Sequence, residues 1–570
     1  MNRLDLDLWK RFYALAKPYW RSEKKGQAWG LLALLVVLLV GYTVSNVFFN
    51  QQTGEFASAL AAHNTRRFWR AVILFSGLLV VAVPVYSFYY YVRDRLAVQW
   101  RLWFTDRILA RYFGNHAYYR VASEHEIDNP DQRISEDVRS FTAESLNFLL
   151  IFTSALFELI GFSGVLWSIS RLLVVILVIY AVAGTFVTVG IFSNRMISLY
   201  FEKLKREADF RFGMVRIREN AESIAFYRGE GQEKSQVQRR FMRVFDNFLQ
   251  LIRWSLGLNS FTYFYSFITL VLPSLIVAPR VLSGEMEVGR VIQAQGAFAS
   301  VLAALTVFVN NLEYLSGFAA SVKRLDTFSA TLAPEQVALQ AAGNHIMNRE
   351  GDDLRFDGFT LQTPDHARTL IKALNVRVAP GEGLLISGES GSGKSSLLRA
   401  VAGLWQSGSG IIERPKPEDM LFLPQRAYMI LGNLRQQLIY PNLARDVSEQ
   451  ELREVLDRVN LRDLVTRCNG FEAEMDFDKV LSEGERQRLA FARILLNRPK
   501  YALLDEATSA LDRENEAALY SLLASLPITL VSVSHHQSLL KYHAQVLELT
   551  GGGAWRVCPA EEFSFSETTA

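Results

Sequence analysis

Long apolar runs dominate the first part of the chain, whereas the remainder alternates short apolar stretches with polar ones. Six runs reach the roughly 20 mostly apolar residues that a helix needs to cross a bilayer. They are residues 29–49, 69–91, 146–169, 172–194, 256–278 and 288–312. The pattern therefore predicts six transmembrane spans, followed by a soluble region.

The spans are unevenly spaced, with long charged intervals at residues 93–145 and 195–255. Both intervals are rich in helix formers, so we expect the spans to continue into water as long helices. Lys and Arg crowd these intervals, and the positive-inside rule then places them, the N-terminus and the C-terminal half in the cytoplasm. The first external loop, with Arg66, Arg67 and Arg70, fits this rule less well.

Residues 4–20 are expected to form an amphipathic helix that lies on the membrane surface. Its apolar side chains would contact lipid or the next helix; they are Trp9, Phe12, Tyr13, Leu15, Tyr19 and Trp20.

Composition agrees with a membrane protein, because half of the 570 residues are hydrophobic and 12% are aromatic. The net charge of +3 is too small to indicate a nucleic-acid partner. The two cysteines, Cys468 and Cys558, lack zinc or redox spacing, so a reducing, cytoplasmic setting is expected for that half.

The segment from Gly388 to Ser395 matches the phosphate-binding loop, Gly-x4-Gly-Lys-Ser. A buried strand is expected before it at 383–387 and a helix after it at 395–404. Backbone N–H groups and the helix N-terminus would cradle the phosphates of ATP, Lys394 would reach the β- and γ-phosphates, and Ser395 would bind Mg²⁺. The expected ATP-binding residues here are Gly388, Glu389, Ser390, Gly391, Ser392, Gly393, Lys394, Ser395 and Ser396.

A second buried strand is predicted at 500–504, and it ends in the acidic pair Asp505 and Glu506. Asp505 is expected to hold the Mg²⁺ shell, and Glu506 to polarise the attacking water. Phosphoryl transfer depends mainly on positioning and charge stabilisation, so few side chains suffice.

With these motifs in order, residues 354–549 resemble the nucleotide-binding domain of an ABC transporter. The resemblance implies further roles. Gln425 matches the glutamine that senses Mg²⁺ and the membrane domain. It is expected to bind the metal together with Ser395 and Asp505. The expected catalytic residues are Lys394, Gln425, Glu506 and His535. His535 matches the switch histidine that contacts the γ-phosphate, and its neighbour His536 is expected to be a bystander.

Ser482 and Gly484 match the family's signature motif, which contacts the γ-phosphate held by a partner subunit; residues 509–512 match the D-loop. Glu483 and Glu485 depart from the commonest signature, Leu-Ser-Gly-Gly-Gln. Because the Ser482 hydroxyl and the backbone at Gly484 remain, we expect an active site, with Glu485 included among the residues that bind ATP.

The base of ATP presents a second departure. Exporters of this family usually stack adenine on an aromatic residue, and Thr363 occupies that position here. Phe356 and Phe359 lie upstream and are not expected to reach the base.

Segments 129–137, 207–230 and 476–485 are similar to subfamily D ABC transporters and their bacterial relatives of the SbmA/BacA-like group. This resemblance covers nearly the whole chain and implies an exporter-type α-helical six-span transmembrane domain fused to an α/β P-loop nucleotide-binding domain. We place the transmembrane domain with its N-terminal helix at 1–322, a linker at 323–350 and the nucleotide-binding domain at 351–570. The first two similar segments would form turns that dock on the ATPase domains.

The resemblance also implies a half-transporter that pairs with a second copy of itself, creating two composite ATP sites. We expect uptake of hydrophilic solutes, such as cobalamin or peptides, across the inner membrane of a bacterium. Export of acyl-CoA, lipid or amphipathic compounds is the main alternative, and an ATP-gated channel or sensor is another. The six spans argue against a soluble ATPase that acts on nucleic acid.

Polar residues within the spans are candidates for a cargo path. Glu158 lies in an apolar helix and stands out. The others are Asn46, Asn50, Gln51, Gln293, Gln295, Asn310, Asn311 and Glu313.

Overall fold

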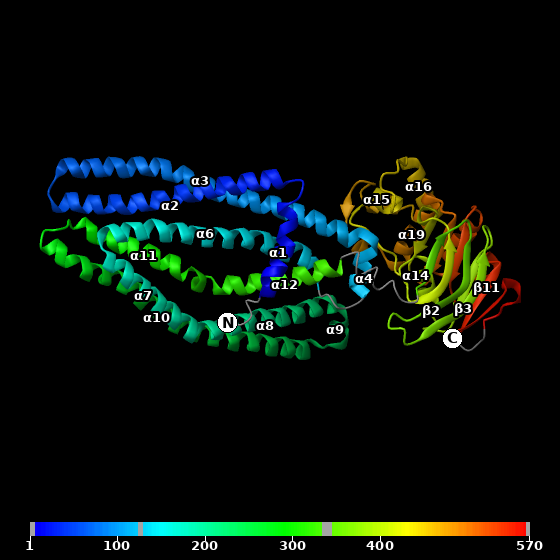
Figure 1. Cartoon of the computed structure of the whole chain (residues 1–570). Helices are drawn as coiled ribbons and strands as arrows, with labels where there is room; N and C mark the ends of the chain where they lie inside the picture. The colour runs from blue at the N-terminus through cyan, green and yellow to red at the C-terminus, as the bar shows by residue number, and fades with distance from the viewer. Residues whose placement is uncertain (1–5, 124–128, 333–344, 566–570) are drawn as a thin grey trace. The chain divides into compact units, whose positions relative to one another are not determined.

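The computed structural model describes residues 6–123, 129–332 and 345–565 (Figure 1). The chain forms two compact units, Met1–Ala333 and Pro334–Ala570. Each unit is described by itself below.

The first unit is helical, and six of the helices in its described part are long and apolar enough to span a membrane. Each of the six predicted runs overlaps one of them, so the prediction of six spans is confirmed. The helices are α1 (Leu6–Trp20), α2 (Lys25–Ala61), α3 (Thr65–Phe113), α4 (Ala117–Ser123), α5 (Pro130–Gln132), α6 (Val138–Ile169), α7 (Arg171–Val187), α8 (Asn194–Glu219), α9 (Ala221–Tyr227), α10 (Glu230–Leu282), α11 (Gly289–Asn310) and α12 (Leu312–Thr331).

Two of these helices are far longer than a span. α3 has 49 residues and α10 has 53, which at 1.5 Å per residue gives each a length of roughly 75–80 Å. The hydrocarbon core is only about 30 Å thick, so both helices continue beyond it, as the charged intervals predicted. The short helix α9 lies between α8 and α10 (Figure 1). Its residues Phe226 and Tyr227 are exposed.

Small residues allow α2 and α11 to approach closely. A Cβ atom on Gly289 would lie 1.9 Å from the Gly54 carbonyl oxygen, and one on Gly296 would lie 2.1 Å from Asn50 Oδ1. Across the same seam Asn50 donates to the Gln293 carbonyl at 3.1 Å. Close backbone packing of this kind stabilises helix pairs in lipid, where the hydrophobic effect between helices is weak.

The N-terminal helix α1 has two different faces. Leu15 and Tyr19 are buried, and Tyr19 stacks on Trp100 of α3 with ring centroids 5.4 Å apart. Trp9 and Tyr13 are exposed. One face of α1 therefore packs on the helical bundle, and only the other is available to lipid.

A buried carboxylate joins the start of α6 to α12. Asp137 accepts hydrogen bonds from Arg324 Nε at 2.8 Å and from Ser321 Oγ at 3.1 Å. Asp137 ends the segment 129–137, so part of that motif supports the helical unit itself. α12 continues to Thr331 and enters the segment 323–350 that we predicted to be a linker. Val322, Leu325 and Phe328 form a buried stripe at helical spacing, so the helix continues past residue 322 without a long apolar run.

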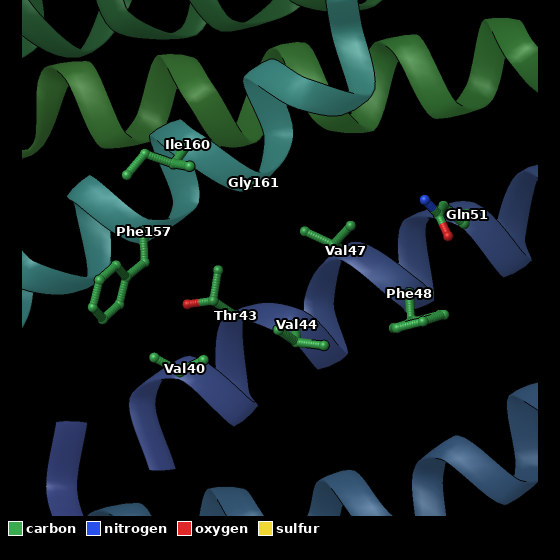
Figure 2. Close-up of a pocket in the computed structure, with 9 residues that line it drawn as sticks. All are labelled: Val40, Thr43, Val44, Val47, Phe48, Gln51, Phe157, Ile160 and Gly161. Atoms are coloured by element: carbon green, nitrogen blue, oxygen red, sulfur yellow. The ribbon is translucent and has the colours of Figure 1, made fainter. Parts of the chain in front are cut away.

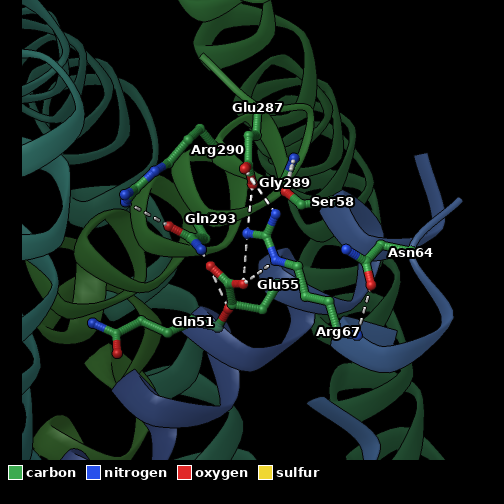
Figure 3. A network of polar contacts seen from close by, with 9 residues as sticks. All are labelled: Gln51, Glu55, Ser58, Asn64, Arg67, Glu287, Gly289, Arg290 and Gln293. Atoms are coloured by element: carbon green, nitrogen blue, oxygen red, sulfur yellow. Dashed lines mark hydrogen bonds and ion pairs between the residues drawn. The ribbon is translucent and has the colours of Figure 1, made fainter. Parts of the chain in front are cut away.

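Charged residues also join the ends of α2, α3 and α11 (Figure 3). Arg67 donates to Glu55 at 2.8 Å and to Glu287 at 2.7 Å, and Asn64 caps α3. The hydrogen bonds from Arg67 hold the pKa of Glu287 below its usual value. The charge of Arg67 is thus compensated locally by two carboxylates.

The second unit is an α/β domain. Its described part contains a six-stranded sheet, a four-stranded sheet and a short two-stranded pair. The six-stranded sheet has the order β12-β11-β4-β10-β9-β6, and its pairs from β11 to β6 are parallel. Its strands are β4 (Leu384–Gly388), β6 (Met420–Leu423), β9 (Tyr501–Asp505), β10 (Thr529–Val533), β11 (Gln545–Gly551) and β12 (Ala554–Pro559). The other sheet has the order β1-β5-β2-β3, with β1 (Met347–Glu350), β2 (Leu354–Gln362), β3 (Thr369–Val378) and β5 (Gly408–Arg414).

Helices flank the parallel sheet, whose central strands are almost entirely buried, as expected for strands covered on both faces. They are α14 (Lys394–Val401), α15 (Leu434–Ile439), α16 (Glu449–Arg458), α17 (Leu464–Arg467), α18 (Phe477–Val480), α19 (Glu483–Asn497) and α20 (Arg513–Ala524). A short antiparallel pair is formed by β7 (Gly432–Asn433) and β8 (Glu474–Met475). Because β10 lies between β4 and β9, the carboxyl ends of these three strands meet at one edge.

Candidate functional site: the carboxyl edge of the parallel sheet

The predicted phosphate loop connects β4 to α14. Two of its glycines are required by geometry: Gly393 has φ +106°, and a Cβ on Gly388 would lie 2.4 Å from the Leu549 carbonyl oxygen. Lys394 is buried, and its Nζ donates to the carbonyls of Gly388 at 2.7 Å and Glu389 at 2.9 Å. The loop is therefore already folded around its lysine.

The remaining loop residues surround the same space. Ser392 Oγ is buried and has no hydrogen-bond partner among the described residues, so it has capacity for an additional contact. Ser395 and Ser396 are half-buried, whereas Glu389, Ser390 and Gly391 are exposed. Burial lowers the pKa of Lys394, and the carboxylates of Glu506 and Asp505 oppose this effect.

The acidic pair at the end of β9 lies opposite this loop. Asp505 accepts from the Ser395 hydroxyl at 3.0 Å, and burial raises the pKa of Asp505. Glu506 accepts from Gln425 Nε2 at 2.9 Å. The sequence-predicted residues Lys394, Ser395, Gln425, Asp505 and Glu506 thus converge.

The end of β10 supplies the expected switch histidine. His535 Nε2 lies 3.8 Å from Glu506 Oε1, and the Glu506 N–H donates to the Val533 carbonyl at 3.1 Å. Burial lowers the pKa of His535, and the nearby Lys394 ammonium lowers it further. His535 is consequently neutral at pH 7 and can act as either donor or acceptor.

His536, expected to be a bystander in the reaction, forms a contact of its own. Its Nδ1 lies 2.9 and 3.0 Å from the two carboxylate oxygens of Glu516, a residue of α20 that the sequence analysis did not single out. The sequence carries little signal for this contact, because it forms only when α20 packs beside the end of β10.

The signature segment caps α19. Ser482 is the N-cap, and Glu485 completes a capping box by accepting from the Ser482 N–H at 2.9 Å and the Ser482 hydroxyl at 3.1 Å. Arg467 also donates to Glu485. The Ser482 hydroxyl is retained, as predicted, but in this structure it donates to Glu485. Gly484 lies under the D-loop, where a Cβ would be 3.1 Å from the Ala510 carbonyl oxygen.

Gln487 was also missed by the sequence analysis. It is buried on α19 and donates to the Gln425 carbonyl at 3.3 Å, while its Oε1 accepts from the Ala510 N–H at 3.1 Å. It therefore connects the segment that contains Gln425 to the D-loop. Residues 485–488 read Glu-Arg-Gln-Arg, four polar residues in a row, and nothing in that pattern marks Gln487 as the buried one.

The position predicted for adenine stacking lies in the turn between β2 and β3. Phe356 and Phe359 are buried in the core of this unit, so they cannot stack on a base, in agreement with the prediction. Thr363 forms the turn itself through its N–H bond to the Arg368 carbonyl at 2.9 Å. The exposed ring in this turn is that of His366.

The candidates for a cargo path lie in the helical unit, and several of them join helices to one another. Asn46 accepts from Tyr86 at 2.7 Å. Gln293 donates to the Gln51 carbonyl at 3.2 Å (Figure 3). Gln295 donates to Ser274 at 2.7 Å, and Asn311 donates to the Val307 carbonyl at 2.8 Å. The side chains of Asn310 and Glu313 lie outside the described residues.

An apolar pocket of about 420 Å³ opens between α2 and α6 (Figure 2). Its lining is Val40, Thr43, Val44, Val47, Phe48, Gln51, Phe157, Ile160 and Gly161. The half-buried Glu158 follows Phe157 on α6.

Comparison with known proteins agrees with this division of the chain. Residues 15–282 match the family described as ABC transporter transmembrane region 2, and residues 371–509 match the family described as ABC transporter. An uncharacterized ABC transporter ATP-binding protein of Synechocystis sp. is 44% identical over 550 residues, which are 95% of this chain and 83% of the relative. The chain belongs to the ABC transporter family.

Two further relatives of this transporter match along almost their whole lengths. The human lysosomal cobalamin transporter ABCD4 is 31% identical, covering 97% of both chains. The Escherichia coli inner membrane ABC transporter ATP-binding protein YddA is 30% identical, covering 92% of this chain and 95% of the relative. The predicted resemblance to subfamily D and its bacterial relatives is therefore confirmed, and the protein is a multi-pass membrane transporter with an ATP-binding domain.

Proposed function

We propose that two copies of this chain form an ATP-driven importer of hydrophilic solutes in a bacterial inner membrane. The observation that carries the ATPase part is the convergence of Lys394, Asp505, Glu506 and His535 at one sheet edge of a single chain. A homodimer of such chains holds two full sets of these groups. Each signature serine, Ser482, then serves the ATP of the other subunit.

The division of labour follows from the chemistry of each group. Glu506 orients and polarises the attacking water, His535 contacts the γ-phosphate, and Lys394 leaves the loop carbonyls to bind the β- and γ-phosphates. The backbone N–H groups of residues 388–396 and the Ser482 hydroxyl complete the ATP contacts, with Gly484 and Glu485 beside them.

Mg²⁺ fits the donor set at this edge. In the described part of the chain no three His, Cys, Asp or Glu side chains cluster as a metal site, but Mg²⁺ commonly uses one or two protein oxygens together with substrate phosphates. Ser395, Gln425 and Asp505 would supply those oxygens. When bound, the ion neutralises phosphate charge that develops during transfer.

The cargo proposal is supported by the relative named as a cobalamin transporter. The proposed inner-membrane location is supported by YddA, which is described as an inner membrane protein. The relative ABCD4, by contrast, is described as lysosomal. We favour uptake of cobalamin or another hydrophilic molecule, including peptides.

One observation favours a different cargo. The pocket between α2 and α6 has an almost wholly apolar lining (Figure 2), which suits an acyl chain better than a hydrophilic solute. Movement of lipid, acyl-CoA or amphipathic compounds is therefore the second candidate function.

Proteoliposomes separate these candidates. The expected result is accumulation of labelled cobalamin above equilibrium on the side that holds ATP and the ATPase domains, with loss of accumulation in Glu506→Gln. Accumulation that is undiminished in Glu506→Gln would overturn ATP-driven transport. ATPase activity that rises with acyl-CoA, but not with cobalamin or peptides, would instead establish the second candidate.

A further inference from the structure

Glu516 is a buried carboxylate that the proposed reaction does not use. Its side chain is 2% exposed, in the first turn of α20. Thr508 Oγ1 donates to its Oε1 at 2.6 Å, Ser538 Oγ donates to its Oε2 at 3.2 Å, and His536 Nδ1 lies 2.9 and 3.0 Å from the two oxygens. A carboxylate is costly to bury unless such bonds satisfy it, so these contacts require an explanation.

The partners of Glu516 stand next to the two residues assigned to hydrolysis. Thr508 follows Glu506 by two positions, and His536 follows His535 directly. The carboxylate accepts from both segments, so His536 must carry its proton on Nδ1. Glu516 thereby joins the segment that follows β9 to the segment that follows β10.

The backbone around Glu506 and His535 needs this support. Glu506 has φ +47°, a left-handed conformation that is sparsely populated by residues other than glycine. Its N–H donates to the Val533 carbonyl and its carbonyl accepts from the Ser509 N–H, each at 3.1 Å. The His536 N–H donates to Ser534 Oγ at 3.1 Å. Among the described contacts, Glu516 is the side chain that spans both turns at once.

We propose that Glu516, acting through Thr508 and His536, is a positioning residue that holds Glu506 and His535 at the spacing required for ATP hydrolysis. The inference rests on the proposed roles of Glu506 and His535. Because Glu516 acts on the alignment of reacting groups and its hydrogen bonds involve no residue of the phosphate loop, its loss affects turnover and leaves ATP binding intact. A misplacement of about 1 Å at such a centre can reduce the rate by about 100-fold.

The test uses the full-length protein in lipid nanodiscs, with steady-state ATPase kinetics. Glu516→Gln keeps the shape and removes the charge, and Thr508→Val removes one hydroxyl at nearly constant volume. Both should lower kcat by at least about tenfold while the KM for ATP changes by less than about twofold. Glu514→Gln is the matched control, because Glu514 is an exposed carboxylate on the first turn of the same helix.

Rescue distinguishes positioning from general support of the fold. Thr508→Ser restores the hydroxyl and should recover most of the turnover lost in Thr508→Val. His536→Gln can still donate to Glu516 and should retain more turnover than His536→Ala. If Glu516→Gln does not fold, the Thr508 pair decides the question.

The inference is overturned if Thr508→Val and Glu516→Gln turn over ATP as fast as Glu514→Gln. It is also overturned if they lose only thermal stability, or if kcat and KM change in proportion. A wild-type protein that does not hydrolyse ATP at all would reject the proposed function itself. That result is distinguishable, because the control would then be equally inactive.

Discussion

Replacing Arg467 by glutamine tests how a signature segment works with a carboxylate in the position of the usual glutamine. Arg467 donates to Glu485, whose side chain is 15% exposed, while the Arg467 side chain is 46% exposed. Burial by itself would raise the pKa of Glu485, but the bonds from Arg467 and Ser482 outweigh it and the pKa is lowered. Glu485 therefore stays charged at pH 7, and Arg467 compensates that charge.

The expected effects differ in size. A half-exposed ion pair contributes about 0.5–1 kcal/mol to folding, so Arg467→Gln should lower Tm by only about 1–4 °C in a domain of this size. The change also leaves the negative charge of Glu485 without a compensating cation. This carboxylate accepts hydrogen bonds from Ser482, which is the proposed contact of the γ-phosphate bound by the other subunit. A like-charge contact at such an interface costs on the order of 1–3 kcal/mol, which corresponds to a KM for ATP about 5- to 150-fold higher.

The assay is the KM for ATP at two salt concentrations, together with Tm. The increase in KM should shrink at high salt, because the repulsion is screened. Arg462→Gln provides the control: Arg462 forms a comparable pair with Asp457 at 2.9 Å, on a highly exposed side chain away from the signature. If Arg467→Gln behaves like Arg462→Gln in KM, the charge on Glu485 does not face a phosphate and the reasoning is refuted.

Three other predictions concern catalysis, pH and helix packing. Glu506→Gln should lower kcat by more than about 100-fold and still bind ATP, as measured by nucleotide binding beside ATPase assays; an unchanged rate would exclude Glu506 from the reaction. Burial lowers the pKa of His543 to about 4 from 6.5, so the unfolded chain gains a proton first as the pH falls below 6.5. By pH 4 this linkage should reduce the free energy of unfolding by roughly 3 kcal/mol. Thermal melts should therefore show that Tm declines less steeply with falling pH in His543→Gln than in the wild type. An equally steep decline of Tm would mean that other groups cause it. A Cβ on Gly184 would lie 2.2 Å from the Tyr265 ring, so Gly184→Ala should disturb the stacked pair of Tyr180 and Tyr265 and cost about 1–3 kcal/mol. Gly190→Ala meets no atom within 4 Å and should melt like the wild type in the same detergent.

The spans, the phosphate loop and the acidic pair could be predicted because each depends on a local pattern. A run of about 20 apolar residues has few alternatives to a membrane helix, and the phosphate loop requires a fixed spacing between a strand and a helix. Asp505 and Glu506 were found because they end a short buried run, which places them at the carboxyl edge of a parallel sheet.

Contacts between distant segments could not be predicted in the same way. Asp137 and Arg324 are 187 positions apart, and Glu516 and His536 are 20 apart on different elements. Each of these residues is an ordinary charged or polar residue in its own segment, and only the packing of helices and strands gives it a partner. The capping box of Glu485 combines both cases: Ser-x-x-Glu is a recognisable local signal, but the contact with Arg467 is not.

The glycine seam between α2 and α11 determines how motion in the helical unit can be observed. At Gly54 and Gly289 the two backbones leave no room for a Cβ atom, and at Gly296 the Asn50 side chain fills that space. We therefore expect the two helices to move together during a transport cycle. Spin labels placed on α2 and α11 beside the seam should report a constant distance with and without nucleotide, and so supply the fixed reference against which the displacement of every other helix can be measured.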